Sequence, residues 1–309
     1  MDYKSFIDKK IGEIKDLIGD QTVVSALSGG VDSSTVTVLS YRAVGNQLKS
    51  YFINDGLMRE NEGENVDRTF ASLGIYINLV DARDRFFKAL KGIENPEEKR
   101  KAFRETFYRT LGEIVKENNA RYLLQGTIKA DIIETQKGIK TQHNVLEQIG
   151  IDPRSFQLEI IEPLKDLYKN EVREVAVELG LPREIYERQP FPGPGLATRV
   201  IGEVTPERVE IVRKATTIVE QELFELEPFQ CFPVLMNDKA TGLKEGERAF
   251  GNIIIVRSVE SVDAMTAEPT EVPWDTLRKI GQRITEELPS VVRVAYEITG
   301  KPPGTIEYI

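Results

Sequence analysis

The stretch Ser28-Gly29-Gly30-Val31-Asp32-Ser33-Ser34 decides how the first half of the chain folds. A short apolar run at 22–27, rich in β-branched residues, comes before it, and a helix-compatible segment at 32–44 follows. The stretch is therefore predicted to be the turn from a buried strand into a helix. Glycines let the backbone approach a ligand closely, and free amides at a helix start attract anions, so this turn is predicted to bind phosphate.

An acidic residue, Asp32, lies inside this turn. A carboxylate beside a phosphate is repulsive unless a cation lies between them, so the sequence predicts Mg²⁺ here with Asp32 as its ligand. The turn lacks the Gly-Lys-Ser/Thr ending of a Walker loop. Without that lysine, transfer of the γ-phosphoryl group is the less favoured chemistry.

The rest of the first half alternates strands with helices. Strand-like runs at 48–53, 75–80, 122–125 and 158–161 are separated by helical segments. Strands that are apolar on both faces and alternate with helices indicate an α/β fold, a parallel sheet with helices on both faces.

The run Gln189-Pro190-Phe191-Pro192-Gly193-Pro194-Gly195 interrupts this pattern, because its prolines and glycines cannot continue a helix or a central strand. We place a domain boundary there, between 1–192 and 193–309. The second domain is expected to be a smaller α+β dimerisation domain, because its sheet would leave one face for a second copy of the chain to cover. Its strands are expected at 198–204, 232–236, 252–258, 291–298 and 306–309, and its helices from 205 and over 274–287.

The composition disfavours several classes of protein. A formal net charge of -9 over 309 residues argues against a nucleic-acid substrate. Cys231 and His143 are each the only residue of their kind, which excludes a disulfide within the chain and a Cys/His zinc site. Charges run through 1–20, and no segment approaches the ~20 apolar residues of a membrane span. A cytoplasmic protein without membrane contact is expected.

The phosphate turn resembles the pyrophosphate loop of the N-type ATP pyrophosphatases, whose fold is adenine nucleotide alpha hydrolase-like. In that superfamily the loop holds the departing pyrophosphate while the adenylyl group passes to a carbonyl oxygen of the substrate. Further segments, spread over nearly the whole chain, resemble the GMP synthetase branch. They include Asn54-Asp55-Gly56-Leu57-Met58-Arg59, Gln125-Gly126-Thr127-Ile128, Pro190-Phe191-Pro192-Gly193-Pro194-Gly195-Leu196 and Lys301-Pro302-Pro303-Gly304-Thr305-Ile306-Glu307, of which the last two are the most specific.

The resemblance implies a ligase that adenylylates XMP with ATP and then forms a C–N bond with ammonia to give GMP. It implies that Asp32, Lys140 and His143 are catalytic. Gln142 and Gln189 stand where the family commonly has histidine. The histidines that relatives have at these two positions are therefore not expected to be strictly required for catalysis. The residues implied to bind ATP are Ala26, Leu27, Ser28, Gly29, Gly30, Val31, Asp32, Ser33, Ser34, Ile53 and Gly126, and those implied to bind XMP are Arg100, Gln230, Lys301, Thr305, Ile306 and Glu307.

A Cys-His-Glu glutaminase triad cannot be assembled from one cysteine and one histidine. The chain therefore resembles the synthetase subunit of the two-subunit form, which takes ammonia from a separate glutamine amidotransferase subunit. Three other interpretations stay open: another ATP pyrophosphatase such as NAD synthetase, a tRNA-modifying enzyme, and a catalytically silent nucleotide sensor.

Overall fold

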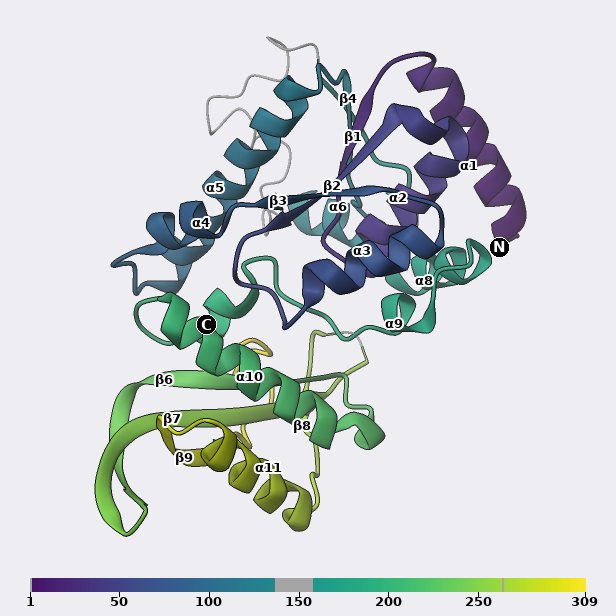
Figure 1. The fold of residues 1–309 in the computed structure, drawn as a ribbon. Helices are drawn as coiled ribbons and strands as arrows, with labels where there is room; N and C mark the ends of the chain where they lie inside the picture. Colours follow the sequence, from purple (N-terminus) through teal and green to yellow (C-terminus); the bar gives the residue numbers. More distant parts are fainter. Residues whose placement is uncertain (1, 137–157, 263) are drawn as a thin grey trace. The chain divides into compact units, whose positions relative to one another are not determined.

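Residues 2–136, 158–262 and 264–309 are described in the structure, a computed structural model whose chain divides into two units (Figure 1). The first unit comprises Met1–Asn54, Asn61–Ala82 and Glu105–Arg188, and the second comprises Asp55–Glu60, Arg83–Arg104 and Gln189–Ile309. Two short segments from the first half of the chain thus belong to the second unit.

A five-stranded parallel sheet forms the centre of the first unit. Its strand order is β3-β2-β1-β4-β5, so the chain steps outward twice from β1 and then returns to its other side. The α/β fold with a parallel sheet is confirmed. The strands are β1 (Val23–Ala26), β2 (Leu48–Asn54), β3 (Ile77–Asp81), β4 (Tyr122–Leu124) and β5 (Glu159–Ile161).

Helices cover this sheet on both faces. Connections between parallel strands are almost always right-handed, so the two outward steps place α2 and α3 on one face and the return places α5 on the other. Helix α2 is buried along most of its length and packs against α1 and α8. The helices are α1 (Tyr3–Ile18), α2 (Val31–Val44), η1 (Gly45–Gln47), α3 (Glu62–Ser72), α5 (Pro96–Glu117), α6 (Lys129–Gln136), α8 (Lys169–Glu178) and α9 (Arg183–Tyr186), of which α5 begins in the second unit.

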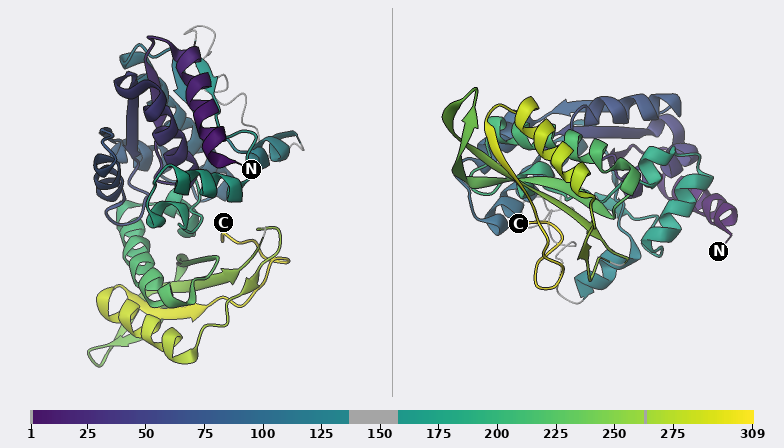
Figure 2. Two further views of the ribbon diagram at one scale, coloured as in Figure 1. Left: turned by 90° about the vertical axis from the view of Figure 1, so that its right-hand side faces the viewer. Right: turned by 90° about the horizontal axis from the view of Figure 1, so that it is seen from below.

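The second unit is built on a four-stranded sheet of order β6-β7-β8, in which β9 also pairs with β7. These strands are drawn in green to yellow in Figure 2. Strands β6 and β7 are antiparallel, whereas β9 runs parallel to β7. Helix α10 packs against β6 and α11 against β9, and the two helices contact each other. The elements are α4 (Arg83–Leu90), η2 (Gly195–Arg199), α10 (Pro206–Glu222), η3 (Phe224–Leu226), β6 (Gln230–Lys244), β7 (Glu247–Glu260), β8 (Glu268–Pro269), α11 (Trp274–Glu287) and β9 (Val291–Tyr296).

Two strands expected from the sequence are wrong. The segment 198–204 is largely the end of η2 and a turn, with one isolated bridge between Val200 and Leu235. The segment 306–309 forms no strand, because the buried side chain of Arg257 binds the carbonyl oxygens of Thr305 and Ile306 that a ladder would need. The regular elements of the second unit after η2 therefore begin with helix α10 and not with a strand.

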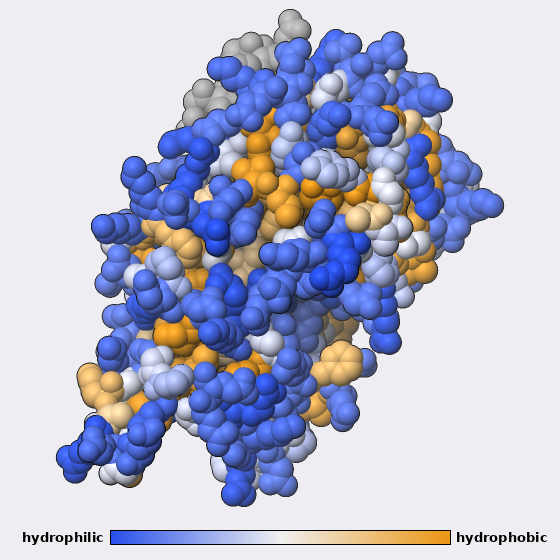
Figure 3. Space-filling view, in the orientation of Figure 1, coloured by the Kyte–Doolittle hydropathy of each residue, from blue (hydrophilic) through white to orange (hydrophobic). Residues whose placement is uncertain are grey.

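The surface is mostly polar on the face shown in Figure 3, where hydrophobic residues form separate patches. Large apolar side chains that are exposed include Tyr76 and Leu79 in the first unit and Phe224, Phe250 and Trp274 in the second. No helix within the described ranges is long and apolar enough to cross a membrane.

Candidate active site

The glycine-rich turn lies at the point where the strand order of the first sheet reverses. Strand β1 has β2 on one side and β4 on the other, and the loops that leave β1 and β4 begin at the same edge of the sheet. In open α/β sheets, ligands bind in the crevice outside the carboxyl ends of the strands at such a reversal. The topology alone therefore marks the turn at 27–30 and the loop at 125–128 as the place for a ligand.

Helix α2 begins directly after the glycines, and Gly30 is its N-cap with no side chain to bind the first amides. The first N–H groups of a helix have no acceptor within that helix. Those of Val31, Asp32 and Ser33 are therefore available to an anion, and the helix dipole favours negative charge at the same place.

The serines of the turn bind each other and hold its shape. The hydroxyl groups of Ser28 and Ser33 are 3.0 Å apart, and the backbone N–H of Ser28 donates to Oγ of Ser33 at 3.2 Å. Ser33 also donates to the carbonyl oxygen of Gly30 at 3.1 Å. These bonds close the turn on itself before any ligand arrives, which reduces the ordering cost of binding.

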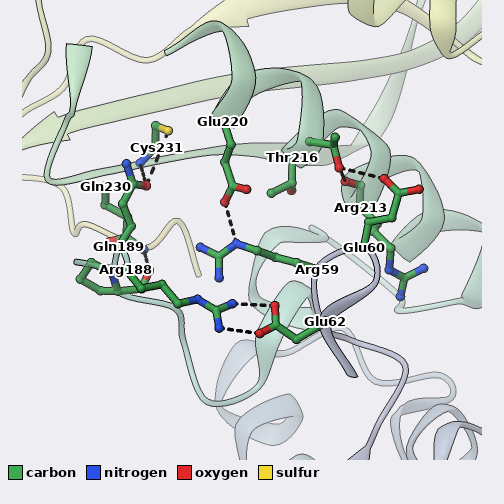
Figure 4. Close-up of polar contacts among 12 residues, drawn as sticks. Arg59, Glu60, Glu62, Arg188, Gln189, Arg213, Thr216, Glu220, Gln230 and Cys231 are labelled. Carbon is green, nitrogen blue, oxygen red and sulfur yellow. Dashed lines mark hydrogen bonds and ion pairs between the residues drawn. The ribbon is translucent and has the colours of Figure 1, made fainter. Parts of the chain in front are cut away.

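The buried ion pair between Arg188 and Glu62, drawn in Figure 4, holds the turn from outside. Arg188 binds Glu62 through two bonds of 2.5 and 2.6 Å and donates to the carbonyl oxygen of Gly29 at 3.1 Å. Only 7% of the Glu62 side chain and 20% of the Arg188 side chain are exposed. Gly29 has a φ of +77°, and a Cβ placed on it would lie 2.9 Å from Glu62 Oε1 and from Val66 Cγ2. Only glycine fits this position.

Asp32, in the first turn of α2, binds a lysine that the sequence did not identify as functional. Nζ of Lys169, at the start of α8, is 2.6 Å from Oδ2 of Asp32. The other oxygen, Oδ1, is buried and receives no hydrogen bond from any described residue. Burial raises the pKa of Asp32, and the Lys169 ammonium group opposes that rise.

The oxygen atoms of the Asp32 carboxylate suit a magnesium ion. A buried carboxylate oxygen without a hydrogen-bond donor is the kind of group that a cation stabilises, and Mg²⁺ prefers oxygen ligands. The described residues contain no cluster of three or more His, Cys, Asp or Glu side chains that could hold a metal. Mg²⁺ is usually held by one or two carboxylates, with substrate phosphates and water as further ligands, so Asp32 with a bound nucleotide would suffice.

The other predicted ATP-binding residues belong to the same edge of the first sheet. Ala26 ends β1, Leu27 follows it, and Ile53 is the penultimate residue of β2. A Cβ on Gly126 would lie 3.1 Å from the backbone of Asp32 and Ser33, so this glycine lets the loop after β4 approach the phosphate turn. Lys140 and His143 lie outside the described residues.

In the second unit, two of the residues expected to bind XMP, Gln230 and Glu307, are hydrogen-bonded to each other. The carboxylate of Glu307 accepts bonds from Nε and Nη2 of Arg199, at 3.3 and 3.1 Å, and from Nε2 of Gln230 at 2.5 Å. The Arg199 side chain is fully buried, and its guanidinium group lies 5.0 Å from the ring centre of Phe191 and 4.3 Å from that of Phe232. The structure thus brings Gln230 and Glu307 together, and Arg199 belongs to the same hydrogen-bonded group.

A second buried arginine holds the backbone of the terminal segment. Arg257 donates to the carbonyl oxygens of Thr299, Thr305 and Ile306 at 2.9, 2.8 and 2.9 Å. Residues Phe232 and Arg257 are opposite each other on β6 and β7, and Gln230 is two residues from Phe232, so all three side chains share one sheet face. Thr305 and Ile306 are thus held by Arg257 through their carbonyl oxygens, and their predicted roles toward XMP stay predictions.

Lys301 and Arg100 have other partners. Nζ of Lys301 donates to the carbonyl oxygen of Ala264 at 2.8 Å. Arg100 binds Glu97, one turn away on the same helix, at 2.5 Å, and 39% of its side chain is exposed. Neither has a described hydrogen bond to Glu307, so their predicted roles toward XMP stay predictions.

Cys231 is a core residue, as its apolar neighbours in the sequence suggest. Burial raises the pKa of its thiol to about 12. Its backbone N–H donates to Oε1 of Gln189 at 3.1 Å, and Gln189 in turn donates to the carbonyl oxygen of Pro228 at 3.0 Å. Gln189 therefore has a structural role at the start of the second unit (Figure 4).

The side chains of the candidate site that sequence reasoning missed are those of Lys169, Arg188, Arg199 and Arg257. Each is a cation whose partner is far away in the chain, for example 137 residues between Lys169 and Asp32. Such residues look like ordinary surface charges in a sequence. Arg188 and Arg199 do flank the proline-rich run at 189–195, which is the one local signal that could have drawn attention to them.

Two family models match successive parts of the chain. The family model described as NAD synthase matches residues 2–193, and the model described as GMP synthase C terminal domain matches residues 217–308. A solved NH3-dependent NAD synthetase from Campylobacter jejuni has a TM-score of 0.48 and 21% identity, covering 61% of this chain and 78% of that chain, a likeness too distant to bear on function.

Relatives that are each named as one subunit of a glutamine-hydrolyzing GMP synthase match far more closely. The protein from Archaeoglobus fulgidus is 53% identical, with both chains covered in full. Those from Pyrococcus furiosus and Methanocaldococcus jannaschii are 52% and 49% identical, over 99% of this chain and 97% and 99% of theirs. The chain therefore belongs to this family of GMP synthase subunits, within the N-type ATP pyrophosphatases.

Proposed function

We propose that this protein converts XMP to GMP, as the synthetase subunit of a two-subunit enzyme. ATP adenylylates a purine carbonyl oxygen of XMP, pyrophosphate leaves, and ammonia then displaces AMP at carbon 2 with formation of a C–N bond. The single observation that carries this proposal is the phosphate turn at the reversal of the strand order, in a chain that matches the GMP synthase subunits from end to end.

The turn suits cleavage of ATP between its α and β phosphates. We assign the β and γ phosphates to the free amides at the start of α2, which also stabilise the negative charge that gathers on the leaving pyrophosphate. The adenosine of ATP would be lined by Ala26, Leu27, Ile53 and Gly126. Lys169 would stabilise the negative charge that forms on the phosphates of ATP. Its ammonium group lies beside Asp32, and 47% of its side chain is exposed and so accessible to the nucleotide.

Magnesium would be held by Asp32 through Oδ1, the buried oxygen that lacks a donor among the described residues. When bound, it would supply positive charge to the pyrophosphate. Asp32, Lys140 and His143 remain the proposed catalytic residues.

The XMP side of the reaction is assigned to the second unit. Glu307 accepts hydrogen bonds and would take them from ring N–H groups or ribose hydroxyls of XMP, with Gln230 beside it. Lys301 and Arg100 are cations suited to the phosphate of XMP, and Thr305 and Ile306 would contribute through the terminal segment.

We assign the ATP pyrophosphatase domain to 1–192 and the dimerisation and XMP-binding domain to 193–309. A homodimer is proposed because Ile253 and Ile255 on β7 are only partly buried and lie beside the exposed Arg293 and Ala295 of β9. Ammonia would come from a separate glutamine amidotransferase subunit, and the setting would be the cytoplasm. Sedimentation velocity would test the dimer.

The test of the proposed function is GMP formation by the purified chain with ATP, Mg²⁺, XMP and ammonium. Glutamine in place of ammonium should give no product until a glutaminase subunit is added. AMP release with deamido-NAD but not with XMP would instead support NAD synthetase chemistry, and a mobility shift with tRNA would support the tRNA-modifying alternative. Failure to release pyrophosphate with all substrates present would support a silent sensor.

A further inference from the structure

We infer that Arg199 is the positioning residue that prepares Glu307 to recognise the purine of XMP. This inference rests on the function proposed above and goes beyond it, because it gives a role to a residue outside the expected XMP-binding set. Arg199 itself is fully buried and would not contact the substrate.

The first support is the geometry of the pair. Nε and Nη2 of Arg199 bind both oxygens of Glu307, the two-pronged arrangement that fixes the plane of a carboxylate. Gln230 binds Oε1 as well, at 2.5 Å. The Glu307 side chain is 22% exposed, so it is held from the protein side while part of it stays accessible.

The second support is the way in which Arg199 is held. Its guanidinium group lies near the rings of Phe191 and Phe232, which stabilise a cation by their electron-rich faces while excluding water. Arg59 lies 4.3 Å from the centre of the same Phe191 ring and binds Glu220 at 2.6 Å (Figure 4). Phe191 thus contacts two arginines, and Arg199 has little freedom to leave Glu307.

The third support is the cost of burial. A fully buried arginine needs a charged partner, and removing one member of such a pair leaves the other charge uncompensated. Glu307 is the partner that the structure gives to Arg199. Held in this way, the carboxylate of Glu307 offers its oxygens as hydrogen-bond acceptors. This selects nucleotides whose base presents ring N–H donors, as the xanthine of XMP does.

The experiment is a double-mutant cycle on XMP binding and turnover with Arg199→Lys and Glu307→Gln. Lysine keeps the charge but loses the two-pronged geometry. We expect Arg199→Lys to raise the KM for XMP on the order of tenfold, the size of one lost charged hydrogen bond, and to leave the KM for ATP within about twofold. In the Glu307→Gln background the same change should add less than about twofold, because Arg199 acts through Glu307.

Two further variants keep the test decisive. Arg208→Lys is the control, because Arg208 is another arginine of the second unit that binds backbone carbonyl groups, those of Ile201 and Met236, away from Glu307. It should lower thermal stability without changing the KM for XMP. If Arg199→Lys does not fold, Phe191→Leu removes one ring beside the guanidinium group and should raise the same KM a few-fold.

An unchanged KM for XMP in Arg199→Lys would overturn the role of Arg199. So would a double variant in which the increase in KM equals the product of the increases in the two single variants. For the second variant, an unchanged KM in Phe191→Leu would do the same. These outcomes differ from failure of the proposed function, in which the unmodified chain itself would form no GMP from XMP.

Discussion

Nζ of Lys169 lies 2.6 Å from Oδ2 of Asp32, although 137 residues separate them in the chain. Lysine on α8 and aspartate at the start of α2 thereby come together beside the amides of the phosphate turn. The opposite oxygen of Asp32 is left without a donor among the described residues. One carboxylate is thus shared between a cation of the protein and the place proposed for the metal.

Replacing Asp32 by asparagine should lower AMP formation by at least about 100-fold, a loss typical of removing one charge-stabilising group from an active site. The reason is that the amide keeps the shape of the side chain but removes the negative charge that would hold Mg²⁺. The measurement is AMP release with XMP and ammonium. Asp16→Asn, an exposed residue of α1, is the matched control and should retain full activity.

Replacing Lys169 by methionine should lower kcat/KM for ATP about 10- to 100-fold, because one charged contact to the nucleotide phosphates is lost. The KM for XMP should stay within about twofold. Lys169→Arg should restore part of the activity. Equal losses for arginine and methionine would show that the charge of Lys169 is not what matters.

Replacing Gly29 by alanine should lower the free energy of unfolding by about 2–4 kcal/mol, from the left-handed backbone and from overpacking. A Cβ there would meet Glu62 and Val66 at 2.9 Å. Gly30→Ala is the control for stability, since Gly30 has an ordinary φ of −75° and its nearest new contact would be Ser28 Oγ at 3.4 Å. Thermal unfolding of both variants measures the difference, and equal melting temperatures would contradict the account of Gly29.

Stability should rise with pH through the titration of Lys99. This buried lysine donates to the carbonyl oxygen of Val200 at 2.7 Å, and burial, aided by nearby Arg208, lowers its pKa from 10.5 to about 8. Between these values the unfolded chain binds more protons than the folded one, so the free energy of unfolding increases with pH, and the gain is lost as pH falls through about 8. At about 1.4 kcal/mol per pKa unit, the rise is on the order of a few kcal/mol.

Denaturant unfolding at several pH values, compared with Lys99→Met, isolates this contribution. The difference between the two proteins should change across the window from about pH 8 to about pH 10. A difference that stays constant with pH would show that Lys99 keeps an ordinary pKa.

Local patterns in the sequence predicted the first unit well. The run at 22–27 and the turn after it became β1 and the start of α2, because apolar β-branched residues, glycines and a helix start each act over a few residues. Strands 122–125 and 158–161 were also placed correctly to within a residue or two. Their order in the sheet depends on pairings between distant segments.

The second unit was predicted less well, for physical reasons that particular residues show. Gly195 has a φ of +58°, and a Cβ on it would lie 2.3 Å from the carbonyl oxygen of Leu57. Gly195 begins η2, which takes up the first two residues of the strand expected at 198–204. The β6–β7 hairpin extends beyond the strands expected from the sequence, because its outer part is polar and lacks the apolar pattern of a buried strand. Its turn, at Glu245 and Gly246, has positive φ at both residues and no Asn-Gly or Asp-Gly signal of a hairpin turn.

The candidate site shows the same division. The turn at 28–34 was found from its own residues, whereas Arg188, Arg199 and Lys169 acquire their roles only from partners brought close by folding. The roles of Lys140 and His143 are implied by the resemblance alone, and they stay predictions.

The most direct test of the central claim follows one oxygen atom. XMP labelled with oxygen-18 at the carbonyl of carbon 2 is converted with unlabelled ATP and ammonium, and the products are analysed by mass spectrometry. Adenylylation of that oxygen predicts one labelled atom in the phosphate of AMP, with pyrophosphate unlabelled. Label in inorganic phosphate together with ADP, or label released to water, would contradict it.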